Sequence, residues 1–244
     1  MKKIKKIKTV MIIQARIGSQ RLPGKTMRLL AGKSLIYRIL ERVKRCKLLN
    51  EIIVAIPDTK ENLVIIKECK KLNVKFFRGS ENNLIERYYF AARFFNADTV
   101  VRLPADNFIP EPCEIDRIVN FHNMKNYFGY STNLQPILGS GYPDGIGAEV
   151  FNFKALEYFY FNPKKVVSYE HISLNFYNFE KKKAVYPKIF SVKTIKCPKK
   201  FSRPDLVFDI NKKSQLNFAR KIYNSLYYKK PNFSIIDVIK YLNN

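Results

Sequence analysis

A basic loop near the N-terminus carries residues whose types and spacing could hold a phosphate. In QARIGSQRLPGKTM, residues 14–27, the cations Arg16, Arg21 and Lys25 lie within ten residues, together with two glycines. Glycines let the backbone approach a ligand closely, and successive amides in such a loop can form a concave anion site. A basic surface connection is the simpler alternative. Three cations and two glycines exceed what a connection needs, so the loop predicts triphosphate binding.

The last residues of this loop match the end of a P-loop, but the spacing of its glycines does not match that motif. Gly24-Lys25-Thr26 matches the end of G-x-x-x-x-G-K-[ST], whereas Gly18 lies one position too far upstream and Ser19 takes the glycine position. A P-loop also continues directly into a helix. Here Gly32 and Ser34 mark a helix start several residues later. The sequence therefore disfavours a P-loop NTPase and favours another kind of phosphate loop.

Cysteine and histidine are too sparse for other familiar kinds of site. The four cysteines lie far apart with no C-x-x-C pair, and there are only two histidines. This pattern disfavours a zinc site and indicates free thiols in a reducing cytoplasm. The start, MKKIKKIKTVMII, resembles a signal peptide, but its apolar run is too short, and no run approaches the length of a membrane span. We therefore expect a basic tail before a first strand, a cytoplasmic location and no membrane insertion.

The net charge of +25, from 45 Lys and Arg against 20 Asp and Glu, has two interpretations. A basic nucleic-acid-binding module would explain it. However, the lysines are scattered along the chain, and no arginine-rich run or RNA-binding aromatic motif accompanies them. We therefore favour solvated lysine-rich faces and expect no nucleic-acid partner, with the nucleic-acid-binding module as the alternative.

The first half of the chain alternates strands with helices. Strands are predicted at 9–15, 51–57, 74–79 and 98–103, and helices from Ser34 to Val43, at 60–72 and at 81–96. This order predicts an α/β fold with a doubly wound, mostly parallel sheet. Ligands of such sheets bind outside the carboxyl ends of the strands. The loops at 16–26, 78–82 and 103–107 all leave such ends, so we expect them to meet at one crevice.

The second half is less regular. We expect a helix near 113–122, a turn-rich segment leading to a strand and a helix near 154–160, extended structure at 184–197, a last strand at 206–210, and a helix from Asn211 to about 228. No repeat or low-complexity linker interrupts the chain, which favours a single domain, 1–244. Within it we expect a nucleotide-binding half at about 1–110, a β-rich excursion at about 125–200, and a return strand with C-terminal helices at 205–244.

Several segments resemble one enzyme family. IIQARIGSQRLPGKTM, with LAGKSLIYRILERVKR after it, resembles the opening of the cytidylyltransferases that activate sugar acids. It is most similar to the spore-coat and surface-polysaccharide branch, which is related to the CMP-Kdo and CMP-sialate synthetases. The resemblance continues in order over about residues 9–225, through EIIVAIPDTKEN, VKFFRGSENNLIERYYFAA, ADTVVRLPADNFIP, YPDGIGAEVFNFKALE, EHIS and DLVFDINKKSQLNFARKIY.

The resemblance implies a reaction and a set of site residues. CTP and an anionic acceptor would give a CMP conjugate and pyrophosphate, with Mg²⁺ as cofactor, in a Rossmann-like homodimer joined through the central excursion. By position, the implied catalytic residues are Arg16, Lys25 and Asp106. The implied nucleotide-binding residues are Ala15, Arg16, Gly18, Ser19, Arg21, Lys25, Gly79 and Ser80; the metal ligands are Asp106 and Asp209; and the acceptor-binding residues are Arg102, Asp144, Glu170 and His171.

The chemistry of these residue types agrees with that reaction. Nucleotidyl transfer needs charge neutralisation on the phosphates more than it needs a nucleophilic side chain. Mg²⁺ prefers one or two carboxylates together with waters and phosphate oxygens. Simpler interpretations stay open: Asp106 as a turn residue, Asp209 as a neighbour of a helix cap, His171 as a packed histidine, and Arg102 as a structural partner of Asp106.

Departures from the family pattern gather on the acceptor side, at Pro104, Ala105, Asn107, Gly147 and Tyr169. The nucleotide loop, in contrast, is intact. Use of CTP is therefore better supported than any one acceptor, which could be a sugar acid or a non-sugar such as a phosphonate. An inactive relative that serves as an assembly subunit is a further alternative.

Overall fold

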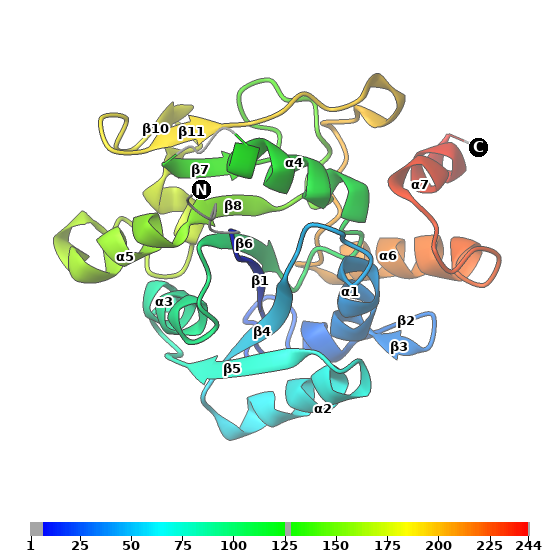
Figure 1. Ribbon diagram of the computed structural model, residues 1–244. Helices are drawn as coiled ribbons and strands as arrows, with labels where there is room; N and C mark the ends of the chain where they lie inside the picture. Colours follow the sequence, from blue (N-terminus) through cyan, green and yellow to red (C-terminus); the bar gives the residue numbers. More distant parts are fainter. Residues whose placement is uncertain (1–6, 125–127, 244) are drawn as a thin grey trace, which may run out of the picture.

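A mixed seven-stranded sheet forms the centre of the molecule (Figure 1). The computed structural model describes residues 7–124 and 128–243, so the predicted basic tail at 1–6 lies outside the described residues. The strand order is β11-β7-β8-β6-β1-β4-β5, and β8 alone runs antiparallel to its neighbours. The strands of this sheet are β1 (Thr9–Gln14), β4 (Glu51–Pro57), β5 (Lys75–Gly79), β6 (Thr99–Pro104), β7 (Gly129–Thr132), β8 (Glu149–Asn152) and β11 (Ser191–Lys193). The predicted doubly wound, mostly parallel fold is confirmed.

Helices cover both faces of the sheet, because its central strands are apolar on both sides. One face is packed by α3 (Leu84–Phe94) and α5 (Phe153–Phe161). The other is packed by α1 (Leu35–Val43), α2 (Leu63–Lys71), α4 (Pro112–Met124), α6 (Lys213–Leu226) and α7 (Ile235–Leu242). Figure 1 shows α3 and α5 on the left of the sheet and α1 and α6 on the right.

The helix after the basic loop begins where its spacing predicted. The Ser34 hydroxyl accepts a hydrogen bond from Tyr37 N at 3.2 Å and caps α1. Between the loop and α1 lie only a short 3₁₀ turn at Lys25–Met27 and a small hairpin of β2 (Leu29–Leu30) and β3 (Lys33–Ser34). The extended helix that follows a P-loop is therefore absent from this described segment.

The second half of the chain differs from prediction in four places. A strand that was not predicted, β7, precedes the turn-rich segment and joins the main sheet. The extended structure expected at 184–197 is mostly irregular, with only β11 in the sheet and β10 (Lys183–Ala184) paired to β9 (Tyr177–Asn178). The strand expected at 206–210 is wrong: this segment forms only isolated bridges, because it runs between two loops and not beside a strand. The helix after it begins at Lys213, two residues beyond the expected Asn211 cap.

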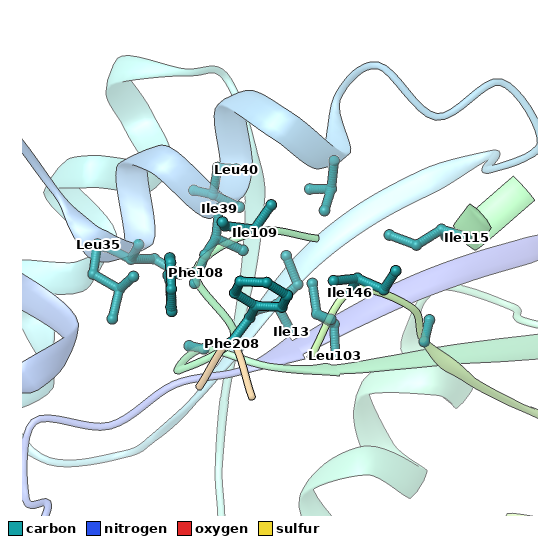
Figure 2. Packing of buried hydrophobic residues seen from close by; sticks show 14 of the residues in the cluster. Ile13, Leu35, Ile39, Leu40, Leu103, Phe108, Ile109, Ile115, Ile146 and Phe208 are labelled. Atoms are coloured by element: carbon teal, nitrogen blue, oxygen red, sulfur yellow. The ribbon is translucent and has the colours of Figure 1, made fainter. Parts of the chain in front are cut away.

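The larger hydrophobic cluster lies directly beneath the segments that carry the predicted carboxylates. Phe108 and Phe208 are fully buried, with ring centroids 5.8 Å apart. Figure 2 shows them among side chains from β1, β6 and α1. Because Phe108 follows Asp106 by two residues and Phe208 precedes Asp209, core packing fixes the backbone of both carboxylates.

Candidate active site

A cavity of about 390 Å³ opens at the carboxyl edge of the parallel strands. The loops after β1, β5 and β6 all contribute to it, which confirms the expected convergence. Its lining comprises Gln14, Ala15, Arg16, Ser19, Gln20, Arg21, Lys25, Thr26, Glu81, Asn82, Leu84, Arg87, Pro104, Ala105, Asp106, Tyr169, Glu170 and His171. Residues predicted for the nucleotide and for the acceptor therefore share one cavity.

Side chains from outside the basic loop hold its backbone in place. Buried Asn62 accepts a hydrogen bond from Ile17 N at 2.9 Å, and the Thr26 hydroxyl donates to the carbonyl oxygen of Arg16 at 2.9 Å. Gly24 has φ 66°, a left-handed conformation that favours glycine. The loop is thus organised while the Arg16 and Arg21 side chains stay exposed at the cavity.

Lys25 points back across the cavity. Its Nζ donates to Asp106 Oδ2 at 2.7 Å, to the carbonyl oxygen of Ile210 at 2.9 Å and to Asn211 Oδ1 at 3.1 Å. The side chain is only 12% exposed. The loop after β1, the end of β6 and the segment before α6 are therefore tied together at one ammonium group.

Asp209 and Asp144 lie beside this ammonium network but outside the cavity lining. The 206–210 segment donates a backbone hydrogen bond from Phe208 N to Asp144 O and another from Ile210 N to Asp106 O. Burial, followed by the charges of Asp209 and Asp106, raises the pKa of Asp144 to about 7. Burial and the charge of Asp106 also raise the pKa of Asp209, whereas Lys25 lowers it. The three carboxylates are thus close enough to repel one another.

This carboxylate set suits a hard cation such as Mg²⁺, which takes oxygen ligands and relieves such repulsion. Within residues 7–124 and 128–243, no three His, Cys, Asp or Glu side chains are grouped closely enough to hold a metal ion. A magnesium ion would therefore need phosphate oxygens and water in addition to Asp106 and Asp209.

The predicted acceptor residues Glu170 and His171 reach the same cavity from the second half of the chain. Leu84 N, at the start of α3, donates to the carbonyl oxygen of Tyr169 at 2.8 Å. The Ser168 hydroxyl accepts from His171 N at 3.0 Å. Because backbone contacts place this segment, the Glu170 and His171 side chains remain exposed at the cavity. The packed interpretation of His171 is therefore wrong.

Arg102 is buried and does not line the cavity. Its Nη1 donates to Glu149 Oε2 at 2.6 Å, so its structural partner is Glu149 and not Asp106. Its Nε donates to Gln14 Oε1 at 2.8 Å. Direct acceptor binding by Arg102 stays a prediction and would require this pairing to open.

Three predicted nucleotide residues, Gly18, Gly79 and Ser80, flank the cavity without lining it. A Cβ on Gly79 would lie 2.9 Å from Phe77 Cε1 and 3.2 Å from Arg87 Cγ, so this glycine leaves room for both side chains. The carbonyl oxygen of Ser80 accepts from Arg87 Nη1 at 3.1 Å. Both residues thus support Arg87.

Gln14 and Arg87 are cavity residues to which the sequence reasoning gave no role. Gln14 is the polar last residue of an otherwise buried strand. Arg87 lies on the buried stripe of α3, three residues after Leu84 and four before Ala91. A polar residue at a strand's carboxyl end and a charge on an apolar helix face are signals that could have identified them.

The departures from the family pattern have three structural settings, one of which is that of Asn107, buried and outside the cavity lining. Pro104, Ala105 and Tyr169 line the cavity. Gly147 instead packs against buried Asn133, whose Oδ1 would lie 2.1 Å from an added Cβ. A side chain at position 147 would therefore clash with the backbone of Asn133 as well as with its side chain.

Comparison with protein families decides the class to which this arrangement belongs. The sequence model of a family described as cytidylyltransferase matches residues 10–233. The chain belongs to the cytidylyltransferase family. It is accordingly a nucleotidyltransferase that uses CTP. This cytidylyltransferase contains no helix, among its described residues, that is long and apolar enough to cross a membrane.

Individual relatives agree with this assignment. The cytidylyltransferase is 34% identical over 205 residues to an uncharacterised protein of Methanocaldococcus jannaschii, covering 84% of this chain and 79% of the relative. It is 26% identical to the spore coat polysaccharide biosynthesis protein SpsF of Bacillus subtilis, covering 95% and 92%. The structure of a cytidylyltransferase from Leptospira borgpetersenii shares its fold, with a TM-score of 0.83, 23% identity, and coverage of 98% and 94%.

Proposed function

We propose that this cytidylyltransferase transfers CMP from CTP to a small anionic acceptor, a sugar acid used for a surface polysaccharide, and releases pyrophosphate. The observation that carries the proposal is the shared cavity, where Arg16, Lys25 and Asp106 meet Glu170 and His171. An acceptor bound beside the latter pair would lie next to a nucleotide held by the basic loop.

In this proposal, the basic residues of the site would bind the phosphates and the acidic residues would bind the metal ion. Arg16, Arg21 and Lys25 would bind the triphosphate and stabilise the departing pyrophosphate. Asp106 and Asp209 would hold Mg²⁺, which when bound supplies charge neutralisation at the phosphates and lowers the pKa of an acceptor hydroxyl. The buried residues that line the cavity would orient the nucleoside and limit the access of water.

The acceptor class rests on two supports. The name of the Bacillus subtilis relative places that protein in polysaccharide biosynthesis, and His171 gives this end of the cavity a group that can donate to an anion. A phosphonate acceptor is the chemical alternative. We further propose a cytoplasmic homodimer without a nucleic-acid partner, which light scattering and a salt series of RNA and DNA binding would test.

A thermal-shift panel of the four nucleoside triphosphates, with and without Mg²⁺, tests the nucleotide part. At a nucleotide concentration about one hundred times Kd, binding adds about 2.7 kcal/mol and raises Tm by about 5–10 °C for a chain of this size. We expect that shift for CTP with Mg²⁺. A larger shift with ATP or GTP, or none with any nucleotide, would contradict the proposal.

Pyrophosphate release tests the acceptor part. With CTP and Mg²⁺ fixed, we expect release with at least one nonulosonic or ulosonic acid and none with the neutral hexoses used as controls. Release with a phosphonate and with no sugar acid would support CMP transfer but reject the proposed acceptor. The absence of release with every acid would favour an inactive relative.

A further inference from the structure

Arg87 is a buried cation without a carboxylate partner. The residue is 5% exposed and lines the cavity from α3. This helix lies beside β5 (Figure 1). One nitrogen, Nη1, donates to the carbonyl oxygen of Ser80 at 3.1 Å. Its Nε is buried and has no hydrogen-bond partner within the described residues. In that same part of the chain, no carboxylate lies within ion-pair distance of Arg87.

Burying an unpaired guanidinium is costly, so this arrangement calls for an explanation. Burial, with a contribution from the positive charge of Arg16, lowers the pKa of Arg87 to about 10, although the charge of Glu81 acts in the opposite direction. Arg16 and Arg87 therefore face one cavity and repel each other. In contrast, Arg102, which is also buried, has its own carboxylate in Glu149.

The neighbouring charges indicate which ligand would satisfy this pair. The basic loop supplies three cations, Arg16, Arg21 and Lys25, and Lys25 also contacts Asp106. A triphosphate carries more negative charge than these three would neutralise while Asp106 is beside them. Two guanidinium groups that line the same cavity match a phosphate better than a singly charged carboxylate.

We propose that Arg87 is a nucleotide-binding residue that, together with Arg16, binds a phosphate group of CTP from the α3 side of the cavity. The inference rests on the proposed function and adds to it a second phosphate-binding element, outside the basic loop. The nucleotide is then held between the end of β1 and the first turn of α3.

A purely structural role is the competing explanation, since the Arg87–Ser80 hydrogen bond also holds the loop after β5. Arg87→Gln removes the charge and keeps an amide group, but its shorter side chain also loses the Nη1 contact with Ser80. Arg87→Lys keeps a charge and removes the guanidinium fork. Arg93→Gln, on the exposed surface of the same helix, is the matched control.

Calorimetric titration with CTP, CMP and cytidine, in Mg²⁺ and at fixed salt, separates the two roles. For Arg87→Gln we expect CTP affinity to fall about 10- to 100-fold while cytidine affinity stays within about twofold. Arg87→Lys should lose less affinity for CTP, and Arg93→Gln should match wild type. A loss that extends to CMP would assign the contact to the α-phosphate.

Two results would overturn the inference. One is unchanged CTP affinity in Arg87→Gln; the other is an equal loss for CTP and cytidine, which would indicate loop organisation or base contact. If Arg87→Gln lacks a cooperative thermal transition, the same comparison is made with Arg87→Lys. Failure of the wild-type protein to bind CTP would instead reject the proposed function itself.

Discussion

Lys25 Nζ lies 2.7 Å from Asp106 Oδ2, although 81 positions separate the two residues in the sequence. The cation predicted for the triphosphate and the carboxylate predicted for the metal are therefore paired with each other. A nucleotide and its cation would exchange these partners: the phosphate would take the ammonium group and the metal the carboxylate. Each member of the Lys25–Asp106 pair would then keep an opposite charge beside it.

Removing the ammonium group tests its part in phosphate binding. We expect Lys25→Ala to lower turnover of CTP by about 100- to 1000-fold, because it deletes a charged donor at the phosphates. The fold should persist, since the basic loop is held independently by Asn62 and Thr26. Steady-state kinetics and thermal unfolding measure both effects, with exposed Lys67→Ala on α2 as control. Wild-type turnover in Lys25→Ala would remove the basic loop from the mechanism.

Neutralising Asp106 tests the metal site. Asp106→Asn keeps the shape of the side chain and should raise the Mg²⁺ concentration for half-maximal turnover by about tenfold or more. Loss of this negative charge should also lower the pKa values of Asp144 and Asp209, because Asp106 raises both. A magnesium titration of turnover measures the first effect. Exposed Asp205→Asn serves as control, and an unchanged Mg²⁺ requirement would argue against Asp106 as a ligand.

The Gln14 side chain tests whether a hydrogen-bond donor at the cavity contacts the substrate. Arg102 Nε donates only, so it fixes Gln14 Oε1 as the acceptor and leaves the Nε2 amide group as a donor at the cavity. Gln14→Glu keeps the Arg102 contact, removes that donor and adds a negative charge at the cavity, so we expect the KM for CTP to rise about tenfold or more. Gln14→Met loses both the hydrogen bond with Arg102 and the amide donor at the cavity, so it should raise the KM for CTP and also lower Tm. An unchanged KM in both variants would show that this donor contacts no substrate.

His122 predicts a pH dependence of stability that is independent of the cavity. Burial lowers its pKa to about 4, and its Nδ1 lies 2.9 Å from the Ser131 hydroxyl oxygen. A depressed histidine pKa means that the unfolded chain binds the proton more readily. The stabilisation from neutral His122 is therefore complete above about pH 6.5 and is lost as pH falls toward 4, by up to about 3 kcal/mol.

His122→Gln should lack this part of the acid sensitivity. Denaturant unfolding at pH 7.5 and pH 5 measures it, as the free energy of unfolding of each protein at each pH. We expect wild type to lose more stability than the variant between these values. Equal losses would mean that His122 is not the group that titrates.

The sequence determined the elements of the nucleotide half and the general place of the site. Apolar runs predicted β1, β4, β5 and β6, because strands that are buried on both faces must be apolar throughout. Ser34 predicted the start of α1, because a helix leaves amide groups that a cap must satisfy locally. Since parallel strands end at one edge, the loops that meet in the cavity followed from the strand order.

Only the tertiary structure decided which side chains face that cavity and which pair elsewhere. Glu149 forms an ion pair with Arg102, and Asp106 forms one with Lys25. Arg87 forms no ion pair with a carboxylate of the described residues. The 206–210 segment likewise lost its expected strand, because its backbone bonds Asp144 and Asp106 and not a neighbouring strand. The physical reason is the range of the interactions. Periodicity and caps act over a few neighbouring residues, whereas ion pairs and burial depend on residues that only the folded chain brings together.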